Sequence, residues 1–574
     1  MTRSVIDPIT RIEGHLRVEM EVTNGKVSDA WVSGGCFRGM EMVVENRTPE
    51  DAAQIVQRIC GVCPVSHAHS SAIAAEKAYG IKISNNARII RNLLEGAQFL
   101  HSHILWFYNL AALDYVNPLN ALKADPADAY DLAQAAGTSM NSDFVALKER
   151  LANFADNGQL SIFSGNWFDA EDGTAYQLPP ELDLICTAHY LEALTMQAKA
   201  SQISAIIGGK MPHVMTLIPG GTAFVPTDQK LDDLKYLVDE IYNWVEATMI
   251  PDTLAIAPYY IDALNWGKGC GRYIAWGVFE GPDWPYGDNY TEQMLNRYLP
   301  MAVLDEQFQA SDVQENLITE YMGRSWYKGS ETYTSPYFVT DPDFTEYNVD
   351  DRYSWVKAPA YDGKPMEAGS MARIFAAYVR GVPFIKEQVD AVLGILGAKP
   401  GDLAAFQSTL GRTAIRQIET IYIANLMVEW VNELAEAIKG GDSEYFREPA
   451  RLTGEGTGFW EAPRGALYHS EKVVDGKIEG YQIIIPSTWN LAPINGDGEH
   501  GPLEQALIGV PVADIEKPIN ALRTVHSFDP CTACAVHVTA RYRQALRDRH
   551  QPLGGEVRWP ISLTTKRPIL LSSW

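Results

Sequence analysis

Apolar residues recur at helical spacing through the middle of the chain. Between 86 and 115 they are three and four positions apart, as at Ile90, Leu93, Ala97 and Leu100, which places them on one face of a helix. The same spacing covers about 184–207, 229–248, 370–396 and 403–439. Gly381 and Pro383 predict a bend or break within 370–396. Several helices of about 20 residues or more indicate a helix bundle.

Two hairpins are predicted outside these helices. Leu16, Val18, Met20 and Val22 alternate with polar residues up to Asn24-Gly25, a pair that favours a type I′ turn. A second hairpin is expected near 472–485, with Asp475-Gly476 at its turn. The expected fold is therefore α+β and mainly α, with a long-helix bundle core and peripheral β-hairpins.

The organisation along the chain predicts one large body. No linker rich in Gly, Ser or Pro and no internal repeat appears in the chain, and we expect most of it to fold as one body around a large core.

Charge and hydropathy narrow the classes of function. The 574 residues carry 47 Lys and Arg against 72 Asp and Glu, a formal net charge of −25, which disfavours nucleic-acid binding. No apolar run reaches the length of about 18 residues that a membrane-spanning helix requires. The N-terminus MTRSVIDPITRIEGH lacks the apolar stretch of a signal peptide, so export would depend on the signal of a partner.

The cysteines indicate metal or redox chemistry rather than a disulfide framework, because their number is odd and four of them form two CxxC pairs. The seven are Cys36, Cys60, Cys63, Cys186, Cys270, Cys531 and Cys534. Cys36, Cys186 and Cys270 belong to no motif, and we interpret them as inert buried thiols.

The two CxxC pairs lie near opposite ends of the chain, in RICGVCPVSH (58–67) and DPCTACAVH (529–537). Four thiolates suit zinc, an iron–sulfur cluster or nickel. Small zinc modules keep their pairs within about 20 residues of each other, whereas nearly the whole chain separates these two. The spacing favours a buried centre that forms only when the chain has folded, with a structural zinc site and isolated redox pairs as alternatives.

Further strings accompany the two pairs. They are DPITRIEGH (7–15), FRGME (37–41), GGKMPH (208–213), PGG (219–221), APRG (462–465) and PSTWN (486–490). Together with the CxxC strings they resemble the large subunits of nickel–iron hydrogenases, and the resemblance extends from Arg11 to His537.

This resemblance implies a nickel–iron centre that splits H2 into protons and electrons or runs the reaction backward. Cys60 and Cys531 would be terminal nickel ligands, and Cys63 and Cys534 would bridge nickel and iron. The iron would carry one carbon monoxide and two cyanides. The proton would go to Cys531 and then to Glu13, a residue that without the resemblance would be interpreted as a surface or ion-paired group.

The resemblance also assigns the surroundings of the metals. Arg464 would lie over them and donate to one cyanide, Asp529 would orient Arg464, and Ser487 would donate to the other cyanide. Pro463 and Leu467 would form the apolar wall around carbon monoxide, and His67 would donate a hydrogen bond to a bridging cysteine sulfur. Val62 and Leu110 would narrow the route by which gas reaches nickel. For the last two, ordinary core packing is the alternative.

A second metal site is implied near the C-terminus. Glu41, the backbone carbonyl of Ile483 and His537 match positions that hold magnesium or sometimes iron. A carboxylate and a carbonyl suit magnesium, whereas histidine is less typical of its ligands.

Three features bear on how far the resemblance extends. The resemblance implies that residues 1–537 form a single large catalytic body and that 538–574 are a C-terminal extension. This extension follows the site at which a C-terminal endopeptidase cuts the precursors of this family, and it is expected to be removed; its retention is the alternative. Ser102 stands where some relatives carry an aspartate that interacts with the arginine. Cys531, in place of selenocysteine, argues against a nickel–iron–selenium enzyme.

The resemblance implies partners and a location. An iron–sulfur small subunit would take the electrons, because no further cysteine cluster is present, and would pass them to a membrane cytochrome. Maturation proteins would supply the ligands of iron. We expect respiratory H2 uptake in the periplasm or at the membrane, after export with the small subunit, with a cytoplasmic location as the alternative. An H2-sensing regulatory hydrogenase and a quinone-docking subunit related to complex I are the alternative functions, and relatives of the latter kind lack the paired cysteines.

Overall fold

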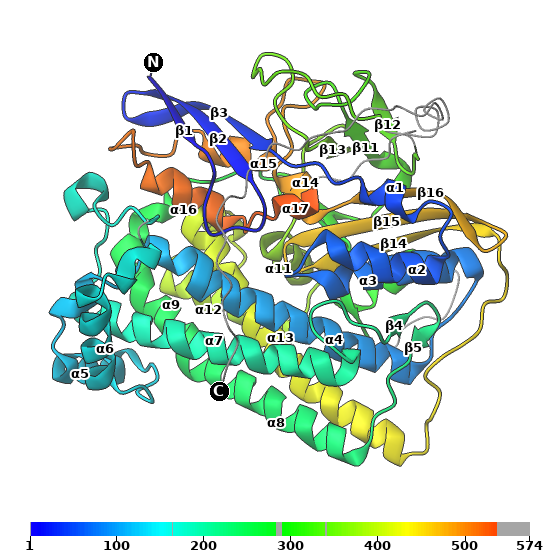
Figure 1. Ribbon diagram of the computed structural model, residues 1–574, viewed down its shortest axis with the longest axis horizontal. Helices are drawn as coiled ribbons and strands as arrows, with labels where there is room; N and C mark the ends of the chain where they lie inside the picture. The colour runs from blue at the N-terminus through cyan, green and yellow to red at the C-terminus, as the bar shows by residue number, and fades with distance from the viewer. Residues whose placement is uncertain (1, 164, 283–289, 339–340, 536–574) are drawn as a thin grey trace, which may run out of the picture.

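The computed structural model describes residues 2–163, 165–282, 290–338 and 341–535 (Figure 1), and at 161–162 and 534–535 it describes the backbone alone. His537 and the extension 538–574 lie outside these ranges, as does the predicted boundary at 537. In the described ranges, no helix combines the length and the hydropathy needed to cross a membrane.

Four long helices form the bundle in the lower half of Figure 1. They are α4 (Asn85–Ile104), α7 (Pro180–Gly208), α8 (Asp228–Trp244) and α13 (Thr409–Lys439). α4 packs against α7 and α13, and α8 packs against the same two helices, so the four close a ring. Their buried apolar side chains belong to the largest core cluster of the molecule. The helices predicted from apolar spacing are thus present.

The predicted break within 370–396 is also present. α11 (Ser370–Val379) ends before Gly381, which has a φ of 86°, and α12 (Pro383–Ile395) begins with Pro383. Two other helices change pitch, since α4 and α8 continue as π-helical segments over Leu105–Ala111 and Val245–Met249. Apolar spacing did not predict these changes.

The N-terminal hairpin consists of β2 (Leu16–Thr23) and β3 (Lys26–Gly34). Its turn has φ values of 53° at Asn24 and 71° at Gly25, which agrees with the predicted type I′ turn. β1 (Thr2–Ile6) adds an edge strand antiparallel to β2, which the sequence analysis did not predict.

The second hairpin is part of a longer sheet of β14 (Gly454–Ala462), β15 (Gly465–Val474) and β16 (Lys477–Ile484). Asp475 and Gly476 form its turn with φ values of 49° and 73°. The mainly α, α+β fold class is confirmed; only the peripheral position of this hairpin differs, because β15 is buried along most of its length. Helix α3 (Pro64–Tyr79) packs on β14, and the apolar cluster around Trp276 packs with Phe459 and Tyr468.

Shorter elements surround the helix bundle and the β14–β15–β16 sheet. The remaining strands are β4 (Leu217–Ile218), β5 (Gly221–Thr222), β6 (Tyr273–Ala275), β7 (Val278–Glu280), β8 (Arg297–Leu299), β9 (Ala302–Leu304), β10 (Ala310–Ser311), β11 (Ile318–Tyr321), β12 (Thr332–Thr334) and β13 (Ala358–Tyr361). The remaining α-helices are α1 (Met40–Val44), α2 (Pro49–Ile55), α5 (Pro126–Ala136), α6 (Phe144–Asp156), α9 (Ile250–Ile256), α10 (Tyr290–Leu295), α14 (Pro486–Asn490), α15 (Pro502–Leu507), α16 (Ile519–Ser527) and α17 (Thr532–Ala535).

A row of glycines lets α3 lie directly on β14. A Cβ built on Gly454, Gly456 or Gly458 would come within 2.3, 2.1 or 1.9 Å of a backbone carbonyl oxygen of α3. The hydroxyl of Ser70 in α3 donates to the carbonyl of Gly458 at 2.7 Å. Helix and strand are therefore in backbone contact, which glycine alone permits.

Gly458→Ala is expected to destabilise the protein by about 1–3 kcal/mol, the range for overpacking a filled core, because the new methyl group collides with the carbonyl of Ser70. The midpoint of thermal unfolding, followed by circular dichroism, measures the effect. Gly394→Ala in α12 is the control: a Cβ there meets nothing within 4 Å, so stability should stay equal or rise slightly. Equal midpoints for Gly458→Ala and the wild-type protein would contradict this packing.

Candidate metal centre

The first CxxC pair is positioned by the start of α3. Cys60 directly follows a short 3-10 helix (Val56–Ile59), and Cys63 directly precedes Pro64, the first residue of α3. The backbone N–H groups of Val62 and Cys63 both donate to Cys60 Sγ at 3.2 Å. Two such bonds favour the thiolate form of Cys60.

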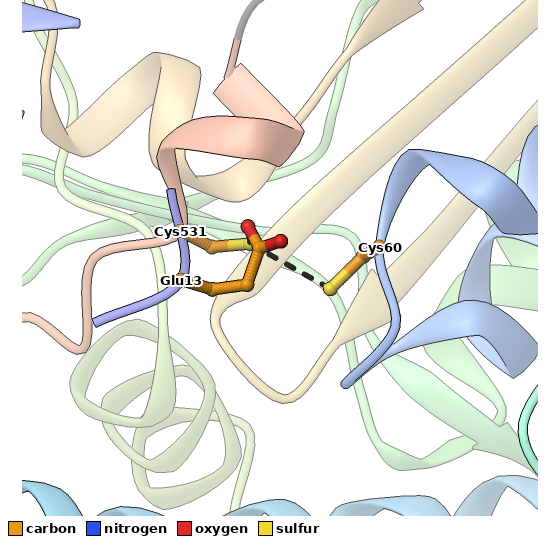
Figure 2. Close-up of side chains that lie close together, drawn as sticks. All are labelled: Glu13, Cys60 and Cys531. Atoms are coloured by element: carbon orange, nitrogen blue, oxygen red, sulfur yellow. Dashed lines mark hydrogen bonds between the residues drawn. The ribbon is translucent and has the colours of Figure 1, made fainter. Parts of the chain in front are cut away.

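Cys531 of the second pair meets the first pair inside the molecule. Cys531 Sγ lies 3.6 Å from Cys60 Sγ (Figure 2), and both residues are at most 1% exposed. A disulfide would require about 2.05 Å, whereas two sulfurs on one tetrahedral metal ion at about 2.3 Å lie about 3.8 Å apart. The distance suits two ligands of a shared metal. Cys534 is in α17, and its side chain lies outside the described part of the structure.

Glu13 completes this group from the N-terminal loop. Figure 2 shows Glu13 and Cys531 together, opposite Cys60, and Cys531 Sγ donates to Glu13 Oε2 at 3.2 Å. These three side chains could hold a metal ion by their mutual distances. Burial raises the pKa of the Glu13 carboxyl, the negative charge of Cys60 raises it further, and the bond from Cys531 opposes the shift. The carboxylate is thus placed to exchange a proton with the Cys531 sulfur.

Arg464 lies in the turn between β14 and β15 and is held by Asp529. Its Nε donates to the backbone carbonyl of Asp529 at 3.0 Å, and Nη2 donates to Oδ1 at 2.9 Å. Burial alone would lower the pKa of the guanidinium, but Asp529 and the thiolates of Cys531, Cys63 and Cys60 raise it well above its ordinary value. Its third nitrogen, Nη1, is buried and has no partner among the described residues.

Other predicted neighbours line the same space. Ser487 Oγ accepts from the backbone N–H of Cys531 at 3.0 Å. Leu467 is fully buried and packs in one apolar cluster with Cys60, Cys63 and Cys531, with half-buried Val62 beside it.

His67 and Pro463 are placed by hydrogen bonds. His67 Nδ1 is 3.2 Å from His469 Nε2, and its Nε2 is buried without a partner in the described ranges. Burial lowers the pKa of His67 to about 4, so the ring is neutral at neutral pH. The carbonyl of Pro463 accepts from Arg373 Nη2 at 2.8 Å.

Leu110 is not in the cysteine cluster. It packs against the core of the helix bundle, and its carbonyl accepts a hydrogen bond from Arg11. In the described structure its surroundings are those of a core residue.

Two residues of the predicted second metal site, Glu41 and Ile483, lie together. Glu41 Oε1 accepts from the backbone N–H of Ile483 at 2.7 Å, so the two residues lie together, but this contact uses the N–H and not the carbonyl. Burial raises the pKa of the Glu41 carboxyl to about 8, although the charge of Lys357 opposes the shift. His537 lies outside the described residues.

The sequence analysis missed the charged residues behind the site. Asp114 bonds both Arg11 and His526 Nδ1, and His526 Nε2 lies 2.9 Å from the carbonyl of Thr10. These bonds tie the loop before Glu13 to α16, just before Cys531. Arg416 in α13 bonds Asp529 from the other side. Neither Asp114 nor Arg416 belongs to a CxxC string; the signal that could have found them is a charge within an apolar helical stripe.

The residues present fit a thiolate-bound metal that carries anionic ligands. The donor set is buried and soft, which suits nickel or another thiophilic metal. The buried Nη1 of Arg464 and Nε2 of His67 have no acceptor in the described protein, and a buried donor without an acceptor is costly. Anionic ligands and sulfurs of a metal centre would satisfy both.

Comparisons with known proteins give the same result. The model of the family described as nickel-dependent hydrogenase matches residues 38–537, and a model described as HoxL-like matches 3–33. The hydrogenase-2 large chain of Escherichia coli (strain K12) is 38% identical over 558 residues, covering 93% of this chain and 97% of that protein. The uptake hydrogenase large subunit of Rhizobium leguminosarum bv. viciae is 37% identical and covers 93% and 95%.

Two solved structures are similar to this chain over 93% of its length. The Ni-Fe-Se hydrogenase from D. vulgaris Hildenborough in the as-isolated oxidized state matches with a TM-score of 0.76 and 33% identity, covering 93% of this chain and 100% of that one. The [NiFeSe]-hydrogenase of Dm. baculatum matches with a TM-score of 0.75 and 35% identity, with the same coverage. The chain therefore belongs to the nickel-dependent hydrogenase family and is a hydrogenase.

Proposed function

We propose that this chain catalyses the reversible heterolytic cleavage of H2 into protons and electrons, in the direction of respiratory H2 uptake. The observation that carries the proposal is the buried contact of Cys60 Sγ with Cys531 Sγ at 3.6 Å, with Glu13 Oε2 3.2 Å from Cys531. Soft metal ligands and a proton acceptor are thereby in one place, as heterolytic cleavage requires.

Four thiolates hold the metals in this proposal. Cys60 and Cys531 would hold nickel alone, and Cys63 and Cys534 would hold both nickel and an iron, which would carry one carbon monoxide and two cyanides. When bound, the nickel–iron group supplies the site at which H2 binds and gives up its electrons. The two N–H bonds to Cys60 stabilise its negative charge and fix its direction, as outer hydrogen bonds to metal ligands do.

The protein moves the proton away through Glu13. The Cys531 sulfur holds the proton first, and Glu13 Oε2 takes it at 3.2 Å. The raised pKa of the carboxyl brings it closer to the working pH, which makes proton exchange in both directions easier.

The surrounding groups hold and shield the metals. Arg464 Nη1, free of protein partners in the described ranges, would donate to one cyanide, with Asp529 as its orienting group, and the hydroxyl of Ser487 would donate to the other. Pro463 and Leu467 would line the side of carbon monoxide, and His67 Nε2 would donate to the sulfur of a cysteine shared by the two metals. Val62 narrows the gas route at the metals, and Leu110 does so farther out in the helical core.

A magnesium ion, or iron, is proposed at Glu41, Ile483 and His537. The supporting observation is the fully buried carboxyl of Glu41 beside the backbone of Ile483. A divalent cation there would keep the carboxyl ionised despite its burial.

The electrons leave through a partner. Membership among hydrogenase large subunits implies a small subunit, and outside the CxxC pairs this chain has three cysteines in separate segments, Cys36, Cys186 and Cys270, too few for a cluster of its own. We propose that this small subunit carries iron–sulfur clusters and delivers electrons to a membrane cytochrome. Export with the small subunit to the periplasm, maturation proteins for the iron ligands, and removal of 538–574 by an endopeptidase belong to the same proposal.

Metal content tests the centre itself. The purified complex should contain nickel and iron, and infrared spectroscopy should show cyanide and carbonyl stretching bands. Zinc as the sole metal, without these bands in active protein, would refute the proposed centre and favour a structural zinc site.

Cys531→Ser should abolish H2 oxidation and lower the nickel content, because a hydroxyl is a poor ligand for a soft metal. Dye reduction by H2 and elemental analysis measure the two effects. Cys186→Ser is the matched control, since Cys186 is also buried but lies in α7, outside the cysteine cluster; it should keep both nickel and turnover. Near-normal turnover in Cys531→Ser would remove this sulfur from the mechanism.

Glu13→Gln should lower H2 oxidation by about 10²–10⁴-fold, the usual contribution of a proton-transferring group, while nickel content stays unchanged. The amide retains the size of the carboxylate but cannot accept the proton. Glu149→Gln, on the exposed side of α6, controls for the loss of one negative charge. Wild-type turnover in fully loaded Glu13→Gln would mean that the proton leaves by another route.

A further inference from the structure

The carboxylate of Asp529 lies between two buried arginines. Oδ1 accepts from Arg464 Nη2 at 2.9 Å, and Oδ2 accepts from Arg416 Nη1 at 2.7 Å. All three residues are at most 4% exposed. Each carboxylate oxygen thus has its own guanidinium, and no other carboxylate of the described chain pairs with Arg464.

Arg416 is itself held by a group other than Asp529. It projects from α13, and its guanidinium stacks on the ring of Trp106 at 4.2 Å. Trp106 Nε1 in turn donates to the carbonyl of His526 at 2.8 Å, on the helix that leads to Asp529. The stacked, planar guanidinium is therefore fixed in position, which is the property that distinguishes arginine from lysine.

The direction of Arg464 depends on this arrangement. Asp529 holds two of its three guanidinium nitrogens, Nε and Nη2, and Nη1 is buried without an acceptor in the described ranges. Asp529 has a φ of 51°, an uncommon backbone conformation for a residue other than glycine. Among the described residues, Arg416 supplies the side-chain bond to Asp529 that comes from outside the Arg464–Asp529 pair.

The three groups also set the local charge. Two guanidinium groups and one carboxylate leave one positive charge beside the buried thiolates. Without Arg416, Asp529 would neutralise Arg464, and Oδ2 would remain buried without its donor, which costs free energy.

We propose that Arg416 is a positioning residue of the metal centre. Through Asp529 it aims the free Nη1 N–H of Arg464 at the small anionic ligand bound beside the thiolates, and it keeps the net positive charge that this ligand and the thiolates require. The inference rests on the proposed function, because the ligand is a cyanide of the nickel–iron group.

The test compares infrared spectra of the purified complex of both subunits. Arg416→Met removes the charge and the donor, and it should displace the cyanide bands and lower H2 oxidation about tenfold at equal nickel content. Arg416→Lys keeps a charge and a donor but cannot keep the flat stack on Trp106 together with the bond to Asp529. Its cyanide bands and turnover should fall between those of the wild type and Arg416→Met.

Arg91→Met is the matched control. Arg91 in α4 is 1% exposed and bonds Glu76 with both Nη atoms. Glu76 lies near the C-terminal end of α3, whereas Cys63 precedes the first residue of that helix. This variant should lower the thermal unfolding temperature as Arg416→Met does, but its cyanide bands should stay at the wild-type position. A loss of stability alone would therefore leave the cyanide bands unshifted.

Wild-type cyanide bands in Arg416→Met would overturn the inference. If Arg416→Met does not retain nickel, the comparison moves to Arg416→Lys, and wild-type bands in that variant would overturn it equally. Absence of cyanide bands in the active wild-type complex would instead refute the proposed function, so the two failures are distinguishable.

Discussion

The centre depends on a short backbone contact between the two ends of the chain. The N–H of Thr532 donates to the carbonyl of Glu13 at 2.8 Å, and the Thr532 hydroxyl donates to the same carbonyl at 3.1 Å. This parallel bridge brings Glu13 and Cys531 side by side. Gly14 permits it, since a Cβ there would lie 2.2 Å from Thr532 Oγ1 and its φ is 89°. The thiolates of Cys60 and Cys531 repel each other at 3.6 Å. Because the two residues are far apart in the sequence, this backbone contact helps to keep Cys531 beside Cys60.

Burial makes every charge near the centre depend on a partner. A buried ion without its counterion is strongly destabilising, and the structure pairs Arg464 with Asp529 and Arg11 with Asp114. The second pair lies directly behind the Glu13 loop, where His526 joins it. The same burial that raises the pKa of Glu13 and lowers that of His67 thus also fixes the surrounding ionic groups in single orientations.

Helix α3 and strand β14 hold residues of the metal centre in place. The helix begins directly after Cys63, and the strand ends at Ala462, directly before Pro463 and Arg464. Because the glycine row brings the two backbones into contact, these ends cannot shift independently of each other. Helix α4 of the bundle contacts α3, and α13 contributes Arg416. The first CxxC pair and the Arg464 guanidinium are therefore positioned by two elements in direct backbone contact.

The sequence by itself determined the features that depend on residues close to one another along the chain. Apolar spacing located the long helices and the break at Gly381, the Asn24-Gly25 and Asp475-Gly476 turns located the hairpins, and the CxxC strings indicated soft metal ligands. These features follow from local geometry and from the chemistry of single side chains.

The tertiary structure decided which distant groups meet. It alone places Cys60 Sγ 3.6 Å from Cys531 Sγ, joins Arg416 to Asp529, adds β1 to the first hairpin and leaves Leu110 in the helical core. Cys60 and Cys531 are 471 positions apart, and Arg416 and Asp529 are 113 positions apart, so no local pattern encodes these contacts. They arise when burial brings charged and polar groups together and requires each to find a partner.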